Sequence, residues 1–211
     1  MANVATFTFN VFQENTYLVY DDTKEAIIFD PGCSNEAEQA ELINFLESND
    51  LKLVRLINTH CHLDHVFGNK FIADTFNLPL EIHKGEIPVL EWSSKSAAKY
   101  GIPMEPSPAA SKFIEEGDII KFGDTQLEAL LTPGHSPASL SFFCKEHRFV
   151  IAGDVLFHGS IGRTDLPGGS FDTLINSIKT KLLPLGDDVR VYPGHMQATT
   201  IGFEREHNPF L

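Results

Sequence analysis

The sequence has no long apolar run, few cysteines and few basic residues. No stretch approaches the roughly 20 consecutive apolar residues that a membrane-spanning helix needs, and the segment MANVATFTFN lacks a basic region followed by an apolar one. We therefore expect a cytoplasmic protein without a membrane partner. The cysteines, Cys33, Cys61 and Cys144, are widely spaced and form no Cys-x-x-Cys pair, which argues against a disulfide framework or a thiolate zinc site.

Basic residues are scarce, since 16 Lys and Arg stand against 29 Asp and Glu, for a formal net charge of −13. Such a chain repels polyphosphate and shows no local basic cluster, so we expect no nucleic-acid partner. The 211 residues are 42% hydrophobic and 21% charged, which is typical of a soluble globular chain with ample core material. We expect one domain spanning residues 1–211.

Short segments rich in β-branched and aromatic residues predict strands that alternate with helices. The first half is expected to form strands at 5–12, 15–22 and 24–32, a helix at 36–49, a strand at 51–58, a helix at 66–77 and a strand at 80–83. The second half is expected to form strands at 118–122, 125–131, 139–144 and 147–152, a helix near 171–182 and a strand at 189–195. Two such halves predict an α/β fold of two mixed β-sheets flanked by helices.

Residues 84–112, between the two halves, mix helix signals with Pro and Ser. This pattern favours a surface excursion or lid over a linker between independent domains. The single tryptophan, Trp92, lies in this segment. Packing is the expected role of its ring, and a wall facing a substrate is the alternative.

The segment NTHCHLDHVFGN, residues 58–69, carries more coordinating side chains than folding requires. His60 and His62 alternate along an extended segment, so both can face one metal, whereas Cys61 between them should point away into packing. Asp64 and His65 lie where a strand gives way to a helix, so their donors can face a second metal about 3.5 to 4 Å from the first.

Four ligands do not complete two metal sites, so the pattern predicts further donors at the ends of other strands. His135 in LLTPGHSPAS, Asp154 in FVIAGDVLF and His195 in VRVYPGHMQ each follow a predicted strand. Imidazole and carboxylate suit zinc but also accept iron and manganese. We therefore expect two divalent ions, with zinc as the first choice and iron or manganese as alternatives.

These motifs resemble those of the metallo-β-lactamase superfamily, in which His-x-His-x-Asp-His is followed by a His, an Asp and a His in that order. The resemblance implies an αβ/βα sandwich with the site at one sheet edge. It implies a first metal on His60, His62 and His135 and a second on Asp64, His65 and His195, with Asp154 bridging both. Asp30 in FDPG matches the first motif of the superfamily and would support the metal loop without binding a metal.

Within the superfamily, TPGHSPASLSF, IAGDVLFHGSIGR and VYPGH resemble the glyoxalase II group, and GSIGRTDLPGGS resembles its short bacterial branch. β-Lactamases of the best-known class have Cys at the bridging position, where this chain has Asp154, and the acidic charge disfavours the RNA-processing members. Glyoxalase II proper has an additional C-terminal helical region that helps to bind glutathione, whereas this chain ends about sixteen residues after His195. A glutathione pocket must then come from elsewhere, or the substrate differs.

The resemblance implies hydrolysis of a small thioester or ester. Water held between two divalent metals loses a proton near neutral pH, and this bridging hydroxide would attack the carbonyl. Asp64 and Asp154 are the expected catalytic carboxylates. A thiol of pKa about 8.5 leaves without strong acid help, so thioesters need no obvious general acid. The alternative is a persulfide dioxygenase of the same superfamily, which uses a single iron on the first site.

Arg163 follows Asp154 in a glycine-rich loop and is the expected anchor for a substrate carboxylate, because guanidinium binds carboxylate through two parallel hydrogen bonds. Structural pairing with Asp165 is an equal alternative. Four further histidines are expected at the surface or behind the site rather than on a metal, namely His83, His147, His158 and His207. The oligomeric state is left open by the sequence.

Overall fold

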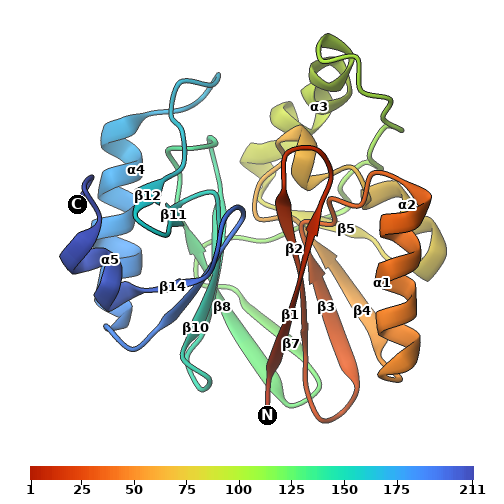
Figure 1. Ribbon diagram of the computed structural model, residues 1–211, viewed down its shortest axis with the longest axis horizontal. Helices are drawn as coiled ribbons and strands as arrows, with labels where there is room; N and C mark the ends of the chain where they lie inside the picture. Colours follow the sequence, from red (N-terminus) through yellow and green to blue (C-terminus); the bar gives the residue numbers. More distant parts are fainter.

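The computed structural model describes residues 1–211 and contains two six-stranded β-sheets with helices on both outer faces (Figure 1). The first sheet has the strand order β1-β2-β3-β4-β5-β6, formed by Asn3–Phe9, Glu14–Tyr20, Glu25–Phe29, Lys52–Ile57, Leu80–Ile82 and Lys112–Phe113. Its first three strands are antiparallel, and β3 to β6 are parallel. The first sheet is therefore mixed.

The second sheet has the order β14-β13-β10-β9-β8-β7. Its strands are β7 (Ile119–Phe122), β8 (Thr125–Leu131), β9 (Leu140–Cys144), β10 (Phe149–Gly153), β13 (Arg190–Pro193) and β14 (Thr199–Thr200). Only β10 and β13 pair in parallel, so this sheet is mixed as well. A separate short hairpin consists of β11 (Leu156–Phe157) and β12 (Ser160–Ile161).

Five α-helices flank the sheets: α1 (Glu36–Ser48), α2 (Asn69–Phe76), α3 (Ile87–Lys99), α4 (Phe171–Ser177) and α5 (Ile201–His207). Short helical turns occupy η1 (Leu63–His65), η2 (Lys84–Glu86), η3 (Ile178–Leu182) and η4 (Leu183–Leu185). Figure 1 shows α1 and α2 outside the first sheet and α4 and α5 outside the second. None of the helices has the length and apolar content that crossing a bilayer requires.

The alternation of apolar residues along the strands explains these layers. Ile27 and Phe29 of β3 belong to the apolar layer between the two sheets, whereas Ala26 and Ile28 belong to the layer under α1 and α2. Between the sheets, the ring centroids of Phe29 and Phe142 are 4.9 Å apart. Because successive side chains of a strand point to opposite faces, a strand buried on both faces reads as a continuous apolar run. The predicted α/β sandwich is confirmed.

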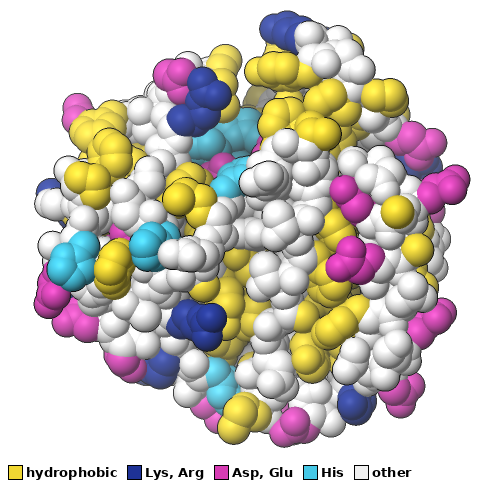
Figure 2. Space-filling model, viewed as in Figure 1, with side chains coloured by type: hydrophobic (Ala, Val, Ile, Leu, Met, Phe, Trp, Pro, Cys, Tyr) yellow, Lys and Arg dark blue, Asp and Glu magenta, His cyan; other side chains and the backbone are white.

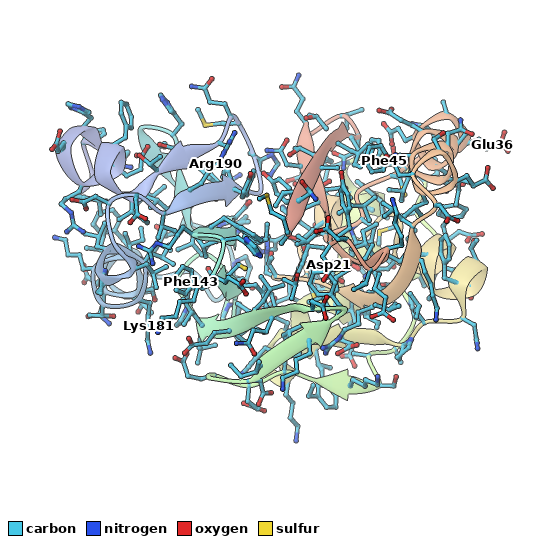
Figure 3. All side chains as sticks on the ribbon, turned by 90° about the horizontal axis from the view of Figure 1, so that it is seen from below. Asp21, Glu36, Phe45, Phe143, Lys181 and Arg190 are labelled. Atoms are coloured by element: carbon cyan, nitrogen blue, oxygen red, sulfur yellow. The ribbon has the colours of Figure 1, made fainter.

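The N-terminal part of α1 is fixed by a cap and its C-terminal part by aromatic packing. Asn35 accepts hydrogen bonds from the backbone N–H groups of Ala37 and Glu38, two donors that the first helical turn leaves free. Phe45 meets Phe7 edge to face, with ring centroids 5.3 Å apart. Figure 3 shows Phe45 between the helix and the first sheet, with Glu36 at the outer side of the molecule.

Several predicted boundaries are corrected by the structure. The helix predicted at 66–77 begins at Asn69, because the preceding residues turn and the Gly68 N–H binds the Pro31 carbonyl at 2.7 Å. The helix predicted at 171–182 is α helical only to Ser177 and then widens into the π-helical turn η3. The short strands β6, β11, β12 and β14 and the helix α5 were not predicted.

Residues 84–112 leave the first sheet after β5 and return to it near β6, with α3 between them. In Figure 1, α3 stands at the upper end of the molecule, beyond the ends of β4 and β5. Thus the segment is an excursion that carries a full helix. Movement of α3 as a lid stays a prediction.

Candidate metal centre

Three histidines from two loops form the first group of donors. His60 and His62 follow β4, and His135 follows β8. The Nδ1 atom of His62 is 2.8 Å from Nε2 of His135, and one donor atom from each of the three rings lies within 4.8 Å of the others. The ends of β4 and β8 thus bring together the three residues predicted for one metal.

Asp64, His65 and His195 form a second group, again with one donor atom from each within 4.8 Å of the others. Asp64 and His65 lie in the helical turn η1, and His195 follows β13. The Oδ2 atom of Asp64 is 3.2 Å from Nε2 of His195 and 3.6 Å from Nε2 of His65. Residues 130 positions apart in the chain therefore share one small volume.

Asp154, which follows β10, contacts both groups. Its Oδ2 atom lies 3.4 Å from Nε2 of His135 and 3.5 Å from Nε2 of His195, and its Oδ1 atom lies 3.5 Å from Nε2 of His65. Burial acts to raise the pKa of Asp154, but the neighbouring His65 and the other histidines outweigh it and hold this pKa well below the usual range. The carboxylate between the two groups is therefore ionised.

The donor atoms fit divalent cations. His60 Nε2, His65 Nε2 and Asp154 Oδ1 are buried without any hydrogen-bond partner, although buried polar atoms in folded proteins almost always have one. Burial lowers the pKa of His60 well below its usual value and that of His62 to about 4, so both rings keep the neutral form that binds metals. Nitrogen and carboxylate oxygen donors suit zinc, iron and manganese.

Asp30 lies behind this cluster. It accepts hydrogen bonds from the backbone N–H and the hydroxyl of Thr59, at 2.7 and 2.6 Å, and its Oδ2 atom is 3.2 Å from Nδ1 of His65. This contact turns the other ring nitrogen of His65 toward Asp64 and Asp154. One oxygen of Asp30 also lies within 4.8 Å of donor atoms of His60 and His65, so its predicted role of supporting the ligands without binding a metal stays a prediction.

Two buried glutamates at the site were missed by sequence reasoning. Glu86, at the start of α3, accepts hydrogen bonds from the Cys61 N–H at 3.0 Å, the Ser136 hydroxyl at 2.5 Å and the Ala138 N–H at 2.8 Å. It thereby ties the loop of His60 and His62 to the loop of His135. Glu14 begins β2 and lies 3.8 Å from Nδ1 of His65, and burial raises its pKa well above the usual value. Neither residue belongs to a spacing motif that could have revealed it.

A cavity of about 1020 Å³ opens over the donors. Its walls come from α3, the β11–β12 hairpin and the loop near residues 163–168. Figure 2 shows histidines at the bottom of a hollow in the upper part of the view, with hydrophobic side chains gathered on one side. The site is therefore accessible to a small molecule.

The cavity changes the interpretation of Trp92. Its side chain is 47% exposed and lines the cavity, so the predicted packing role was wrong and the alternative, a wall of the cavity, agrees with the structure. Large rings project here because α3 leaves the sheets instead of packing into the core.

Arg163 also lines the cavity, and its guanidinium binds both carboxylate oxygens of Asp165, at 2.7 and 2.8 Å. Of the two roles considered for Arg163, pairing with Asp165 is the one that the structure contains, and substrate anchoring stays a prediction. Cys61 is fully buried in the apolar layer under the helices. The four discounted histidines, His83, His147, His158 and His207, belong to none of the donor groups.

Comparisons with known proteins agree with this geometry. A family model described as "Metallo-beta-lactamase superfamily" matches residues 9–195. The chain is similar to hydroxyacylglutathione hydrolase GloC of Haemophilus influenzae, with 40% identity over 211 residues that cover 99% of this chain and 98% of that protein.

Two solved structures share the fold along their whole length. The BLEG-1 B3 metallo-β-lactamase superposes with a TM-score of 0.89 at 37% identity, covering 100% of this chain and 99% of that one. TTHA1623 in a di-iron-bound form superposes with a TM-score of 0.89 at 36% identity, covering 99% of this chain and 100% of that one. The fold, the donor-rich centre and these similarities agree, and this chain belongs to the metallo-β-lactamase superfamily of metal-binding hydrolases.

Proposed function

We propose that this chain is a dinuclear metal-dependent hydrolase of a small thioester or ester, of the hydroxyacylglutathione hydrolase type. The observation that carries the proposal is the position of Asp154, whose carboxylate lies within 3.5 Å of histidines from both donor groups. A carboxylate placed in this way can bridge two cations. The 40% identity with a hydroxyacylglutathione hydrolase supports the substrate class.

The donors divide into two sets. One ion would be held by His60, His62 and His135, the other by Asp64, His65 and His195, with Asp154 shared by both. When bound, such ions polarise a carbonyl and lower the pKa of a water to about 7. Asp30 orients His65, and Asp64, which lines the cavity, is the carboxylate placed to hold or pass a proton beside the substrate.

Thioester hydrolysis requires no strong general acid in addition to these metal ligands and Asp64. The water gives up a proton, which Asp64 is placed to accept, as its oxygen bonds to the acyl carbon. The carbon–sulfur bond then breaks, the electron pair leaves with sulfur as a thiolate, and the proton passes to the thiolate or to solvent. Because a thiol has a pKa of about 8.5, this departure needs no strong acid. A β-lactam is the second hydrolytic candidate, because the chain is similar to the BLEG-1 B3 metallo-β-lactamase. It is expected to react more slowly than a thioester, because an amide nitrogen leaves poorly without a proton.

A mononuclear iron persulfide dioxygenase is the non-hydrolytic candidate. The iron in the TTHA1623 structure supports iron as a metal for this fold. Two histidines of the first donor group with Asp154 would form the two-histidine, one-carboxylate set typical of oxygen-activating iron. This reaction would leave Asp64, His65 and His195 without a metal.

Elemental analysis of the purified protein, followed by a thiol-release assay on S-lactoylglutathione, tests the proposal. We expect close to two metal ions per chain and thiol release that a chelator abolishes and added metal restores. A chromogenic cephalosporin assayed in parallel measures β-lactam hydrolysis. One iron per chain, with oxygen uptake on glutathione persulfide and no thiol release, would instead establish the dioxygenase.

A further inference from the structure

One face of α3 forms a wall of the cavity. Trp92, Ser96, Lys99 and Tyr100 all line it, and their spacing of three and four residues places them on one side of a helix. Tyr100, which follows the helix, meets Phe12 of the β1–β2 turn edge to face, with ring centroids 6.2 Å apart. The wall is therefore held at its far end by the first sheet.

The carboxylates that line the cavity lie at the metal centre, whereas the lysine and arginine lie on its other walls. The only carboxylates among the lining residues are Asp64 and Asp154 of the metal centre, and the lysine and arginine side chains are Lys99 and Arg163. Arg163 is neutralised by its two hydrogen bonds to Asp165. The lysines that pair with a carboxylate within 4.0 Å are Lys70, Lys112 and Lys181, and Lys99 is not among them. An unpaired cation on a cavity wall without a neighbouring carboxylate favours an anionic ligand.

The ammonium group of Lys99 lies 5.0 Å from the centroid of the Trp92 ring. This cation–π contact holds the charge beside a half-exposed apolar surface of the cavity. A ligand with an anionic group and a carbon chain would match both the ammonium group and the ring, because the anion pairs with Lys99 and the chain covers Trp92. Thiols of this kind are released when the thioesters of cysteine peptides and of phosphopantetheine are hydrolysed. Each has a carbon chain next to the sulfur and an anionic group further along.

We propose that the α3 wall binds the thiol part of the substrate, and that this part carries a carboxylate or phosphate recognised by Lys99. The inference rests on the proposed thioester hydrolysis and adds the residues that bind the leaving thiol and the charge that they recognise. It also provides, within this single chain, a binding surface for the thiol next to the metal centre.

Lys95 offers a matched control. Its ammonium group lies 5.2 Å from the same Trp92 ring, but Lys95 does not line the cavity. We would compare Lys99→Met, Lys99→Arg and Lys95→Met on three lactoyl thioesters, those of glutathione, of 4′-phosphopantetheine and of neutral N-acetylcysteamine. Lys99→Met is expected to raise KM about tenfold for the anionic substrates with little change in kcat. It should leave the neutral substrate unaffected, and Lys99→Arg and Lys95→Met should resemble the wild type.

The anionic substrate that loses more affinity identifies the group, carboxylate or phosphate, that Lys99 binds. Equal effects of Lys99→Met and Lys95→Met, or an equal loss on the neutral thioester, would overturn the role of Lys99 while the thioesterase stands. Absence of thiol release from all three substrates by the metal-loaded wild type would overturn the proposed function and this inference with it.

Discussion

At the scale of single residues, the metal centre depends on side chains that folding alone does not explain. His60 is fully buried, its Nε2 atom has no hydrogen-bond partner, and its Nδ1 atom lies 3.1 Å from the Thr59 hydroxyl. The Thr59 contact fixes the ring, so that the free nitrogen faces His62 and His135. A ring held in this way is expected to bind a metal rather than to fill space.

His60→Ala is therefore expected to remove the ion of the first donor group and to abolish turnover. Elemental analysis should show a loss of about one ion per chain, because three donors fall to two. His207→Ala, at an exposed ring outside both groups, is the control and should keep full occupancy. Two ions per chain in His60→Ala would remove His60 from the ligand set.

The cysteines give a second residue-scale prediction. Burial raises the pKa of Cys33 to about 12, that of Cys61 well above its usual value, and that of Cys144 above its usual value. Since the thiolate is the reactive form, Ellman's reagent should find almost no thiol in the native protein and three after denaturation. A native thiol count of one or more would contradict this burial. The result also sets the background of the thiol-release assay.

At the scale of elements, Glu86 connects α3 to both histidine loops. Its three hydrogen bonds come from residues 25, 50 and 52 positions away. The side chain is fully buried, and these three donors compensate the burial of its carboxylate. The carboxylate thus sets the spacing between the loop of His62 and the loop of His135.

Glu86→Gln should disturb this connection, because an amide NH₂ would face at least one N–H donor. We expect unfolding to become easier by about 1–3 kcal/mol and metal affinity to fall about tenfold or more. Urea denaturation and competition with a chelator measure the two effects. Glu91→Gln, at an exposed position of the same helix, is the control. Unchanged metal affinity in Glu86→Gln would show that the loops keep their spacing without it.

At the scale of the whole molecule, Asp21 links the two sheets at the end opposite the metal centre. Its carboxylate accepts hydrogen bonds from the Thr23 N–H, the Asp124 N–H and the Thr125 hydroxyl, at 3.0, 2.8 and 2.9 Å. The turn between β2 and β3 is thereby joined to the turn between β7 and β8. Figure 3 shows Asp21 at the seam between the two halves of the molecule.

Asp21→Asn should lower the free energy of unfolding by about 1–3 kcal/mol at pH 7, without loss of bound metal. Burial acts to raise the pKa of Asp21, but hydrogen bonds from Thr23 and Thr125 outweigh it and lower the pKa. A lowered folded-state pKa stabilises the protein above the unfolded value of about 3.9, and the stabilisation is lost as pH falls through the folded value.

Urea unfolding at several pH values tests this sign. The difference in the free energy of unfolding between wild type and Asp21→Asn should be largest near neutral pH and should shrink below pH about 4. Asp124→Asn, at an exposed position of the turn between β7 and β8, keeps the backbone N–H that binds Asp21 and should cost little at any pH. If this difference in unfolding free energy grew on acidification, the lowered pKa of Asp21 in the folded protein would be contradicted.

The sequence by itself determined the layers and named the candidate donors. Strands such as Thr125–Leu131 were predicted with their observed bounds, because the alternation of apolar residues is a local property of the chain. The seven predicted donors could be named for the same reason, since each stands in a short motif at the end of a strand. Their assembly at one edge follows from the two-sheet fold, which brings these strand ends together.

Only the tertiary structure decided how the centre is supported and what surrounds it. Glu14 and Glu86 look like ordinary acidic residues in the sequence, because their partners lie in distant loops and follow no spacing rule. For Trp92 and for Arg163 the sequence left two roles open, and only the folded course of α3 and of the loop after β12 decided between packing and exposure of Trp92 and placed Arg163 against Asp165. Burial and long-range contact arise only when the chain has folded, whereas periodicity is present in the chain from the start.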